Sequence, residues 1–111
     1  LLSLSALTLQ GCSSGLEPDT FSVELNEMDY GSRNPPAVIT IRSNIAEPIE
    51  VTNVTVNNGQ CSYMGHDTRF NFPLHFQMGQ IFRLRLKQCN FSNVVQVDIE
   101  TTKGNASYQF N

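Results

Sequence analysis

The chain has 111 residues, only 15% of them charged, and a formal net charge of -3 at pH 7. This is the length of one domain, and the mildly acidic charge speaks against nucleic-acid binding, which needs a basic patch on a basic domain. The many Ser, Thr, Asn and Gln residues are more typical of a secreted β-protein than of a cytosolic helical protein.

An uncharged apolar segment, LLSLSALTL, occupies residues 1–9. It is too short to span a bilayer, but it has the length of the apolar region of a secretory signal peptide. It leads directly into the tetrapeptide Leu9-Gln10-Gly11-Cys12, in which a small residue precedes a cysteine. We therefore expect residues 1–11 to be the remainder of a signal peptide that begins before the first residue of this sequence.

The tetrapeptide resembles the lipobox of bacterial lipoproteins, which has Leu three places before the cleavage point, a small residue just before it and a Cys just after it. The resemblance implies that the Cys12 thiol receives a diacylglyceryl group and that membrane lipid is one partner of the protein. In such lipoproteins, a Ser after the cysteine favours the outer membrane of a Gram-negative cell, facing the periplasm. The alternatives are an ordinary signal peptide and a disulfide role for Cys12.

A short polar segment follows the cysteine. Residues 13–19 (SSGLEPD) contain Gly and Pro, and we interpret residues 12–19 as the lipidated Cys12 and a tether, which reaches at most about 3.3–3.6 Å per residue. Residues 20–111 are then the folded domain.

From residue 20 onward, apolar and polar residues alternate with period two, the pattern of strands with one face in a core and the other in solvent. No stretch keeps apolar residues at helical spacing for long enough to predict a helix. The pattern predicts an all-β fold, a β-sandwich of about seven antiparallel strands that resembles immunoglobulin-like sandwiches but has no Trp. The predicted strands are 20–26, 37–43, 49–58, a weaker 69–77, 81–87, 94–101 and 105–110.

Two local signals refine this prediction. The apolar parity switches within segment 49–58, so we expect a β-bulge or bend near Thr52-Asn53. The tripeptide Lys-Gly-Asn at residues 103–105 lies between two alternating runs and predicts a hairpin in which Gly supplies the positive φ.

Three cysteines are an odd number for a secreted chain. If Cys12 carries lipid, Cys61 and Cys89 remain as a natural disulfide pair in an oxidising compartment. The alternative is a metal site with two thiolates. However, the chain has no CxxC spacing and its two histidines are scattered, so we expect neither a metal nor a cofactor.

The residues give little sign of catalysis. No Gly-x-Ser-x-Gly motif occurs, and the pair His66-Asp67 is isolated in a predicted loop, where a solvated histidine is the ordinary case. We therefore expect a protein that is not an enzyme and has no catalytic residues.

Two surfaces are candidates for binding. Arg83, Arg85 and Lys87 share one face of a predicted strand, where they either pair with acidic neighbours across the sheet or bind an anionic partner. Such a partner is a lipid headgroup, lipopolysaccharide, peptidoglycan or an acidic protein face. The long aromatic loop 59–72 contains Tyr63 and Phe70, which either cover the core or contact a partner.

These observations predict a non-enzymatic, lipid-anchored binding or assembly module of the bacterial cell envelope. One alternative is a lipoprotein inhibitor of a lysozyme-type hydrolase, whose inserted loop is 59–72. Another is a structural subunit of an envelope secretion or pilus complex, which accepts a neighbour's strand at an open sheet edge.

Overall fold

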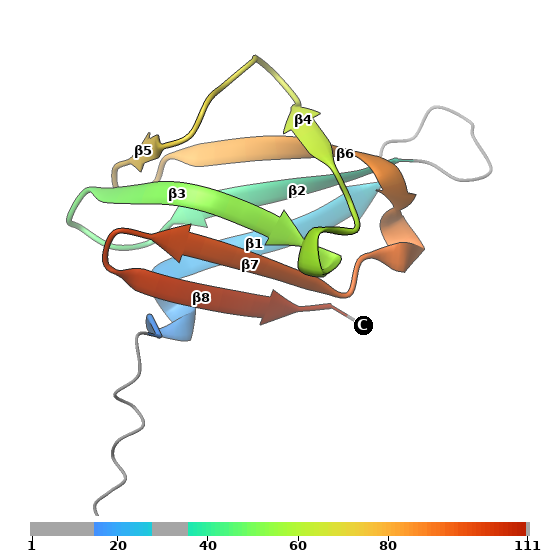
Figure 1. Ribbon diagram of the computed structural model, residues 1–111. Helices are drawn as coiled ribbons and strands as arrows, with labels where there is room; N and C mark the ends of the chain where they lie inside the picture. The colour runs from blue at the N-terminus through green and yellow to red at the C-terminus, as the bar shows by residue number, and fades with distance from the viewer. Residues whose placement is uncertain (1–14, 28–35, 111) are drawn as a thin grey trace, which may run out of the picture.

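The computed structural model describes residues 15–27 and 36–110 (Figure 1). Over these residues the chain forms eight strands and three short 3-10 turns, with no α-helix. The strands are β1 (Phe21–Glu27), β2 (Pro36–Ser43), β3 (Ile49–Val56), β4 (Tyr63–Gly65), β5 (Leu74–Phe76), β6 (Ile81–Asn90), β7 (Gln96–Thr101) and β8 (Gly104–Gln109).

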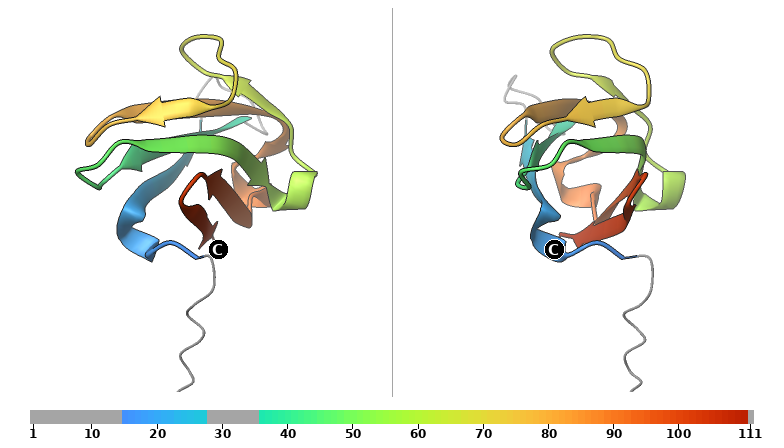
Figure 2. Two further views of the ribbon diagram at one scale, coloured as in Figure 1. Left: turned by 60° about the vertical axis from the view of Figure 1, so that its left-hand side comes forward. Right: turned by 90° about the vertical axis from the view of Figure 1, so that its left-hand side faces the viewer.

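The strands form two four-stranded sheets, which lie face to face in Figure 2. The strand order is β1-β2-β6-β4 in one sheet and β5-β3-β7-β8 in the other, and every neighbouring pair is antiparallel. The prediction of an all-β antiparallel sandwich is confirmed.

The core lies between the sheets and is built from alternate residues of each strand. Ile39 in β2, Leu84 in β6 and Ile99 in β7 are fully buried, while the residues on either side of Leu84 and Ile99 are at least partly accessible. Burying one such side chain contributes about 1.5–3 kcal/mol. Because each strand gains this energy only when its apolar residues face inward, the alternating polar residues must face outward.

The structure corrects the predicted strand at 69–77 and has eight strands over its described residues where about seven were expected. Instead of one strand, the region between β3 and β6 holds two of three residues each, β4 and β5, which belong to different sheets. Phe70 and Phe72 lie outside both strands and pack against the core from the connecting loop. The apolar residues at these positions correctly indicate burial. A side chain in a loop can be buried without its backbone pairing in a strand, so the strand prediction does not follow.

Two local predictions are confirmed. The pairing of β3 with β7 shifts register between Val51 and Asn53, so both Val51 and Val54 face the core despite their odd spacing. The hairpin joins β7 to β8, and Gly104 has a φ of +130°, which a residue with a side chain rarely adopts.

Cys61 and Cys89 form the predicted disulfide, with their Cα atoms 5.7 Å apart. Cys61 also bridges to Val56 at the end of β3, while Cys89 belongs to β6 in the other sheet. The disulfide thus joins the two sheets at one end of the sandwich and leaves neither thiol to bind a metal.

The described chain begins on the edge of β8. Gly15 forms a parallel bridge to Asn105, and the Leu16 amide donates to the Asn105 carbonyl at 2.7 Å. The Tyr108 hydroxyl donates to the Pro18 carbonyl at 2.9 Å and accepts from the Phe21 amide at 3.3 Å. The later half of the predicted tether is therefore held against β8. Cys12 and the predicted signal peptide 1–11 lie outside the described residues.

Leu84→Ala should lower the free energy of unfolding by about 2–5 kcal/mol, because it removes a fully buried side chain from the middle of β6. Ile81→Ala on the same strand is the matched control. Its side chain is 39% exposed, and the expected loss is about 1 kcal/mol or less. Urea unfolding followed by circular dichroism measures both values, and equal losses would contradict the assigned inner face of β6.

Candidate functional site

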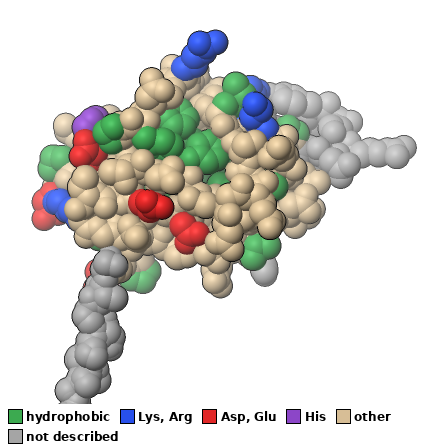
Figure 3. Space-filling model, in the orientation of Figure 1, with side chains coloured by type: hydrophobic (Ala, Val, Ile, Leu, Met, Phe, Trp, Pro, Cys, Tyr) green, Lys and Arg blue, Asp and Glu red, His purple; other side chains and the backbone are tan. Residues whose placement is uncertain are grey.

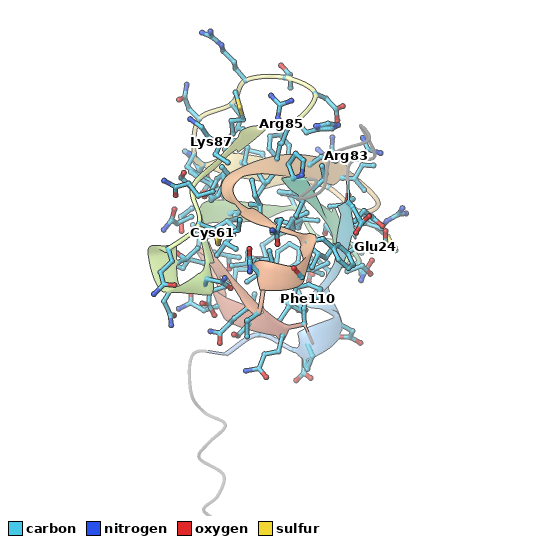
Figure 4. All side chains as sticks on the ribbon, turned by 90° about the vertical axis from the view of Figure 1, so that its right-hand side faces the viewer. Glu24, Cys61, Arg83, Arg85, Lys87 and Phe110 are labelled. Carbon is cyan, nitrogen blue, oxygen red and sulfur yellow. A yellow bond between two sulfur atoms is a disulfide. The ribbon has the colours of Figure 1, made fainter. Side chains whose placement is uncertain are left out.

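The predicted basic residues form a row on the outer face of β6. Arg83, Arg85 and Lys87 alternate with the buried Leu84 and Leu86, so all three cations project away from the core. Alternate residues of a strand are spaced by about 6.6–6.8 Å. Figure 4 shows the three side chains side by side on one side of the molecule.

Only one of these cations forms an ion pair with another described residue. Arg83 Nη1 lies 3.0 Å from Asp67 Oδ2, and both side chains are well exposed, so the pair contributes about 1 kcal/mol or less. Arg85 Nη2 lies 3.4 Å from Met64 Sδ, which is a weak acceptor. The three cations are thus not paired with acidic residues of neighbouring strands. Asp67 belongs to a loop, and it forms an ion pair with Arg83 alone.

The two outer faces of the sandwich carry opposite charge. The outer face of β1-β2-β6-β4 and the adjoining loop after β4 bring together five cations and two carboxylates: Arg42, Arg69, Arg83, Arg85 and Lys87, with Glu24 and Asp67. The outer face of the other sheet carries Glu50, Asp98 and Glu100, and its four strands contain no Lys or Arg. Figure 3 looks onto this second face, with acidic side chains over β7 and β8 and basic ones mainly along the upper edge.

The aromatic side chains of the predicted loop 59–72, which contains the short strand β4, cover the core. Tyr63 and Phe70 stack with their ring centroids 6.4 Å apart, and Phe70 meets the Phe82 ring edge-on at 4.7 Å. The Tyr63 hydroxyl donates to the carbonyl of Val54 in the opposite sheet. These contacts favour the packing interpretation of Tyr63 and Phe70 over partner contact.

A tight turn shapes the rest of this loop. A Cβ atom at Gly65 would lie 1.9 Å from the Thr68 carbonyl oxygen, so only glycine fits there. The turn directs Asp67 back toward Arg83 and leaves Thr68 and Arg69 exposed. Neither Asp67, the partner of Arg83, nor the neighbouring Arg69 could be assigned to this surface from the sequence, because neither shares the period of β6. Gly65 was the one residue in the sequence that could have indicated the turn that brings Asp67 back to β6.

Two hollows lie away from the basic row. An apolar hollow of about 480 Å³ lies beside the end of β1 and is lined by Leu25, Phe91, Val94, Val95 and Phe110, among others. A polar one of about 450 Å³ lies on the acidic face, where the Asp98 carboxylate accepts hydrogen bonds from the Ser107 hydroxyl and the Gln96 amide. Neither hollow includes a residue that the sequence had singled out for binding.

Within residues 15–27 and 36–110, no three His, Cys, Asp or Glu side chains converge in a way that would hold a metal ion. No helix in that part of the chain has the length and apolar character needed to cross a membrane. Comparison of the chain with protein-family models, with curated proteins and with solved structures found no match.

The Tyr63→Phe variant tests the packing role of loop 59–72. Burial raises the pKa of Tyr63 above its ordinary value of 10.0, and the hydrogen bond to Val54 only partly opposes this. The folded state therefore favours protonated Tyr63, and this stabilisation is complete below about pH 10 and is lost as the pH rises through the raised pKa. Removing the hydroxyl should cost about 0.5–1.5 kcal/mol at neutral pH and flatten the alkaline loss of stability.

Urea unfolding of both proteins between about pH 8 and 11 measures this difference. Burial also raises the pKa of Tyr108, which is still present in the Tyr63→Phe variant. The decrease of the free energy of unfolding with pH should therefore become smaller in the variant without disappearing. If the free energy of unfolding falls equally steeply with pH in the two proteins, the Tyr63 hydroxyl is not buried as described.

Proposed function

We propose that this chain is a bacterial lipoprotein, anchored through Cys12, whose β-sandwich acts as a non-enzymatic binding module of the cell envelope. The observation that carries the proposal is the Cys61–Cys89 disulfide. Because it consumes two of the three cysteines, Cys12 is the one left for another chemistry, and it stands directly after an apolar run and a small residue.

The position of Cys12 relative to the folded domain suits an anchor. The described chain joins β8 at Gly15, three positions after Cys12. A lipidated Cys12 would hold the sandwich close to the membrane surface, and Ser13 favours the outer membrane facing the periplasm.

The strand order supports an immunoglobulin-like domain. Without the three-residue β5, the order is β1-β2-β6-β4 in one sheet and β3-β7-β8 in the other, which is the arrangement of constant-type immunoglobulin domains. The absence of Trp and the position of the disulfide at the end of the sandwich are departures from antibody domains. Sandwiches of this kind serve as rigid frames for binding surfaces.

The basic row of Arg83, Arg85 and Lys87 is the proposed binding surface. Arg85 and Lys87 have no ion-pair partner among the described residues, so an anionic envelope component meets them without breaking an internal ion pair. Anchoring raises the effective concentration of the module for any partner held in the same compartment.

The open edge of β1 favours a second candidate function, that of a subunit in an envelope assembly. In the described structure β1 pairs with β2 alone, and the one hydrogen bond on its other edge joins the Phe21 amide to the Tyr108 hydroxyl. An extended segment of a neighbouring subunit would find free backbone groups there. The hydrolase-inhibitor alternative has less support, because the aromatic side chains of loop 59–72 are used in packing.

The Cys12→Ser variant tests the anchor. The full precursor is expressed in a Gram-negative cell fed with an alkyne fatty acid, and the label on the protein is measured together with its distribution between membrane and soluble fractions. We expect the unaltered protein to carry label and to sediment with the membrane, and Cys12→Ser to lose the label because it lacks the acceptor thiol.

The Cys61→Ser, Cys89→Ser double variant is the matched control and should keep the label. Label that survives in Cys12→Ser, or that never appears on the unaltered protein, would rule out lipidation at Cys12.

A further inference from the structure

The contacts of Gly15 and Leu16 fix where the chain enters the sandwich. Both residues lie against Asn105 at the start of β8. Cys12 precedes Gly15 by three positions, and three residues span at most about 11 Å even when fully extended. An anchor on Cys12 would therefore lie beside the edge formed by β8 and the turn Pro18–Thr20.

The basic row lies on the other side of the molecule. β1 adjoins β8 through the Phe21–Tyr108 contact, and β6 is two strands away from β1 in its sheet, a distance of about 10 Å. The two sheets are themselves about 10 Å apart. In Figure 4 Arg83, Arg85 and Lys87 lie on the upper side, whereas Phe110, just after β8, lies on the lower side.

This separation isolates the basic row from the anchoring membrane. At physiological ionic strength, charges are largely screened beyond about 8 Å, and the row lies further than that from the β8 edge. The exposed carboxyl side chains of Glu17 and Asp19 lie beside the point where the chain enters. Lipid headgroups of the anchoring leaflet are thus poorly placed to reach the row.

The form of the surface indicates the kind of ligand. The three cations lie along a single strand over about 13 Å, which suits a linear polyanion better than a small molecule. A shallow hollow of about 230 Å³ adjoins Lys87 and is lined by Pro36, Gln88, Cys89 and Asn90. A second, of about 110 Å³, adjoins Arg83 at the other end of the row.

From this geometry, and resting on the proposed anchor at Cys12, we infer that the basic row binds the carboxylate groups of peptidoglycan on the side away from the anchoring membrane. Peptidoglycan is a linear glycan with repeated carboxylate groups on its peptide stems. Its charges can pair with Arg85 and Lys87, and its sugars can lie over the hollows that flank the row. The protein would thereby connect the membrane to the cell wall.

The test uses the lipid-modified protein purified in detergent and peptidoglycan sacculi freed of other envelope components. Sacculi are sedimented, and bound protein is measured at increasing salt. We expect the unaltered protein to sediment with sacculi and to be released by salt, because the contacts are between exposed charges.

The Arg85→Gln, Lys87→Gln double variant should bind about three- to thirtyfold more weakly, because two exposed ion pairs are lost. Lys103→Gln is the matched control, since Lys103 lies in the turn next to the anchored edge and should leave binding unchanged. Asp67→Asn should strengthen binding, because it frees Arg83 from its ion pair. Circular dichroism confirms that each variant is folded.

A second arm distinguishes the wall from a lipid surface. The protein is inserted through its anchor into phosphatidylcholine vesicles, which are mixed with either sacculi or separate vesicles rich in phosphatidylglycerol. Capture of sacculi that depends on Arg85 and Lys87 supports the inference. Capture of the anionic vesicles instead, capture unaffected by the double variant, or no capture of sacculi would overturn it. Failure of lipidation itself would appear as absence of label on Cys12, while binding of the unmodified protein to sacculi would still be measurable.

Discussion

Burial of the inner faces of the two sheets is the constraint on which the rest of the structure depends. Ile39, Leu84 and Ile99 come from different strands and are completely buried, which fixes the rotation of those strands about their own axes. Once Leu84 and Leu86 point inward, Arg83, Arg85 and Lys87 must point outward. The basic surface is thus a consequence of core packing, and a slip of one residue in β6 would abolish the core and the surface together.

The same alternation explains which features the sequence could predict. The strands, the bulge in β3 and the shared face of the three cations follow from local patterns along the chain. The Cys61–Cys89 pair follows instead from the number of cysteines, once Cys12 is set aside. β4 and β5 could not be predicted, because three residues are too few to show a period and their pairing is decided by β6 and β3. The contact of Asp67 with Arg83 also could not be predicted, because it forms only when the loop after β4 turns back toward β6.

The region between β3 and β6 combines two tasks. Its aromatic side chains close one side of the core, with Phe70 in contact with both Phe72 and Phe82, while its polar tip adds Arg69 to the basic surface. The disulfide at its start ties the loop to β6. Packing and charge are therefore separated between inward and outward side chains of a single loop, which explains how an aromatic segment in an exposed position can contribute to stability and still leave a hydrophilic surface.

The parallel contact of Gly15 and Leu16 with β8 has a mechanical consequence. If the protein links a membrane to another structure, tension enters the domain at this point and first meets the hydrogen bonds from Leu16 to Asn105 and from Tyr108 to Pro18. A short segment lying alongside a strand can be loaded along its length, so that its bonds share the force rather than opening one at a time. Because the Tyr108 hydroxyl bonds to both Pro18 and Phe21, this side chain would bear load before it reaches the pairing of β1 with β2.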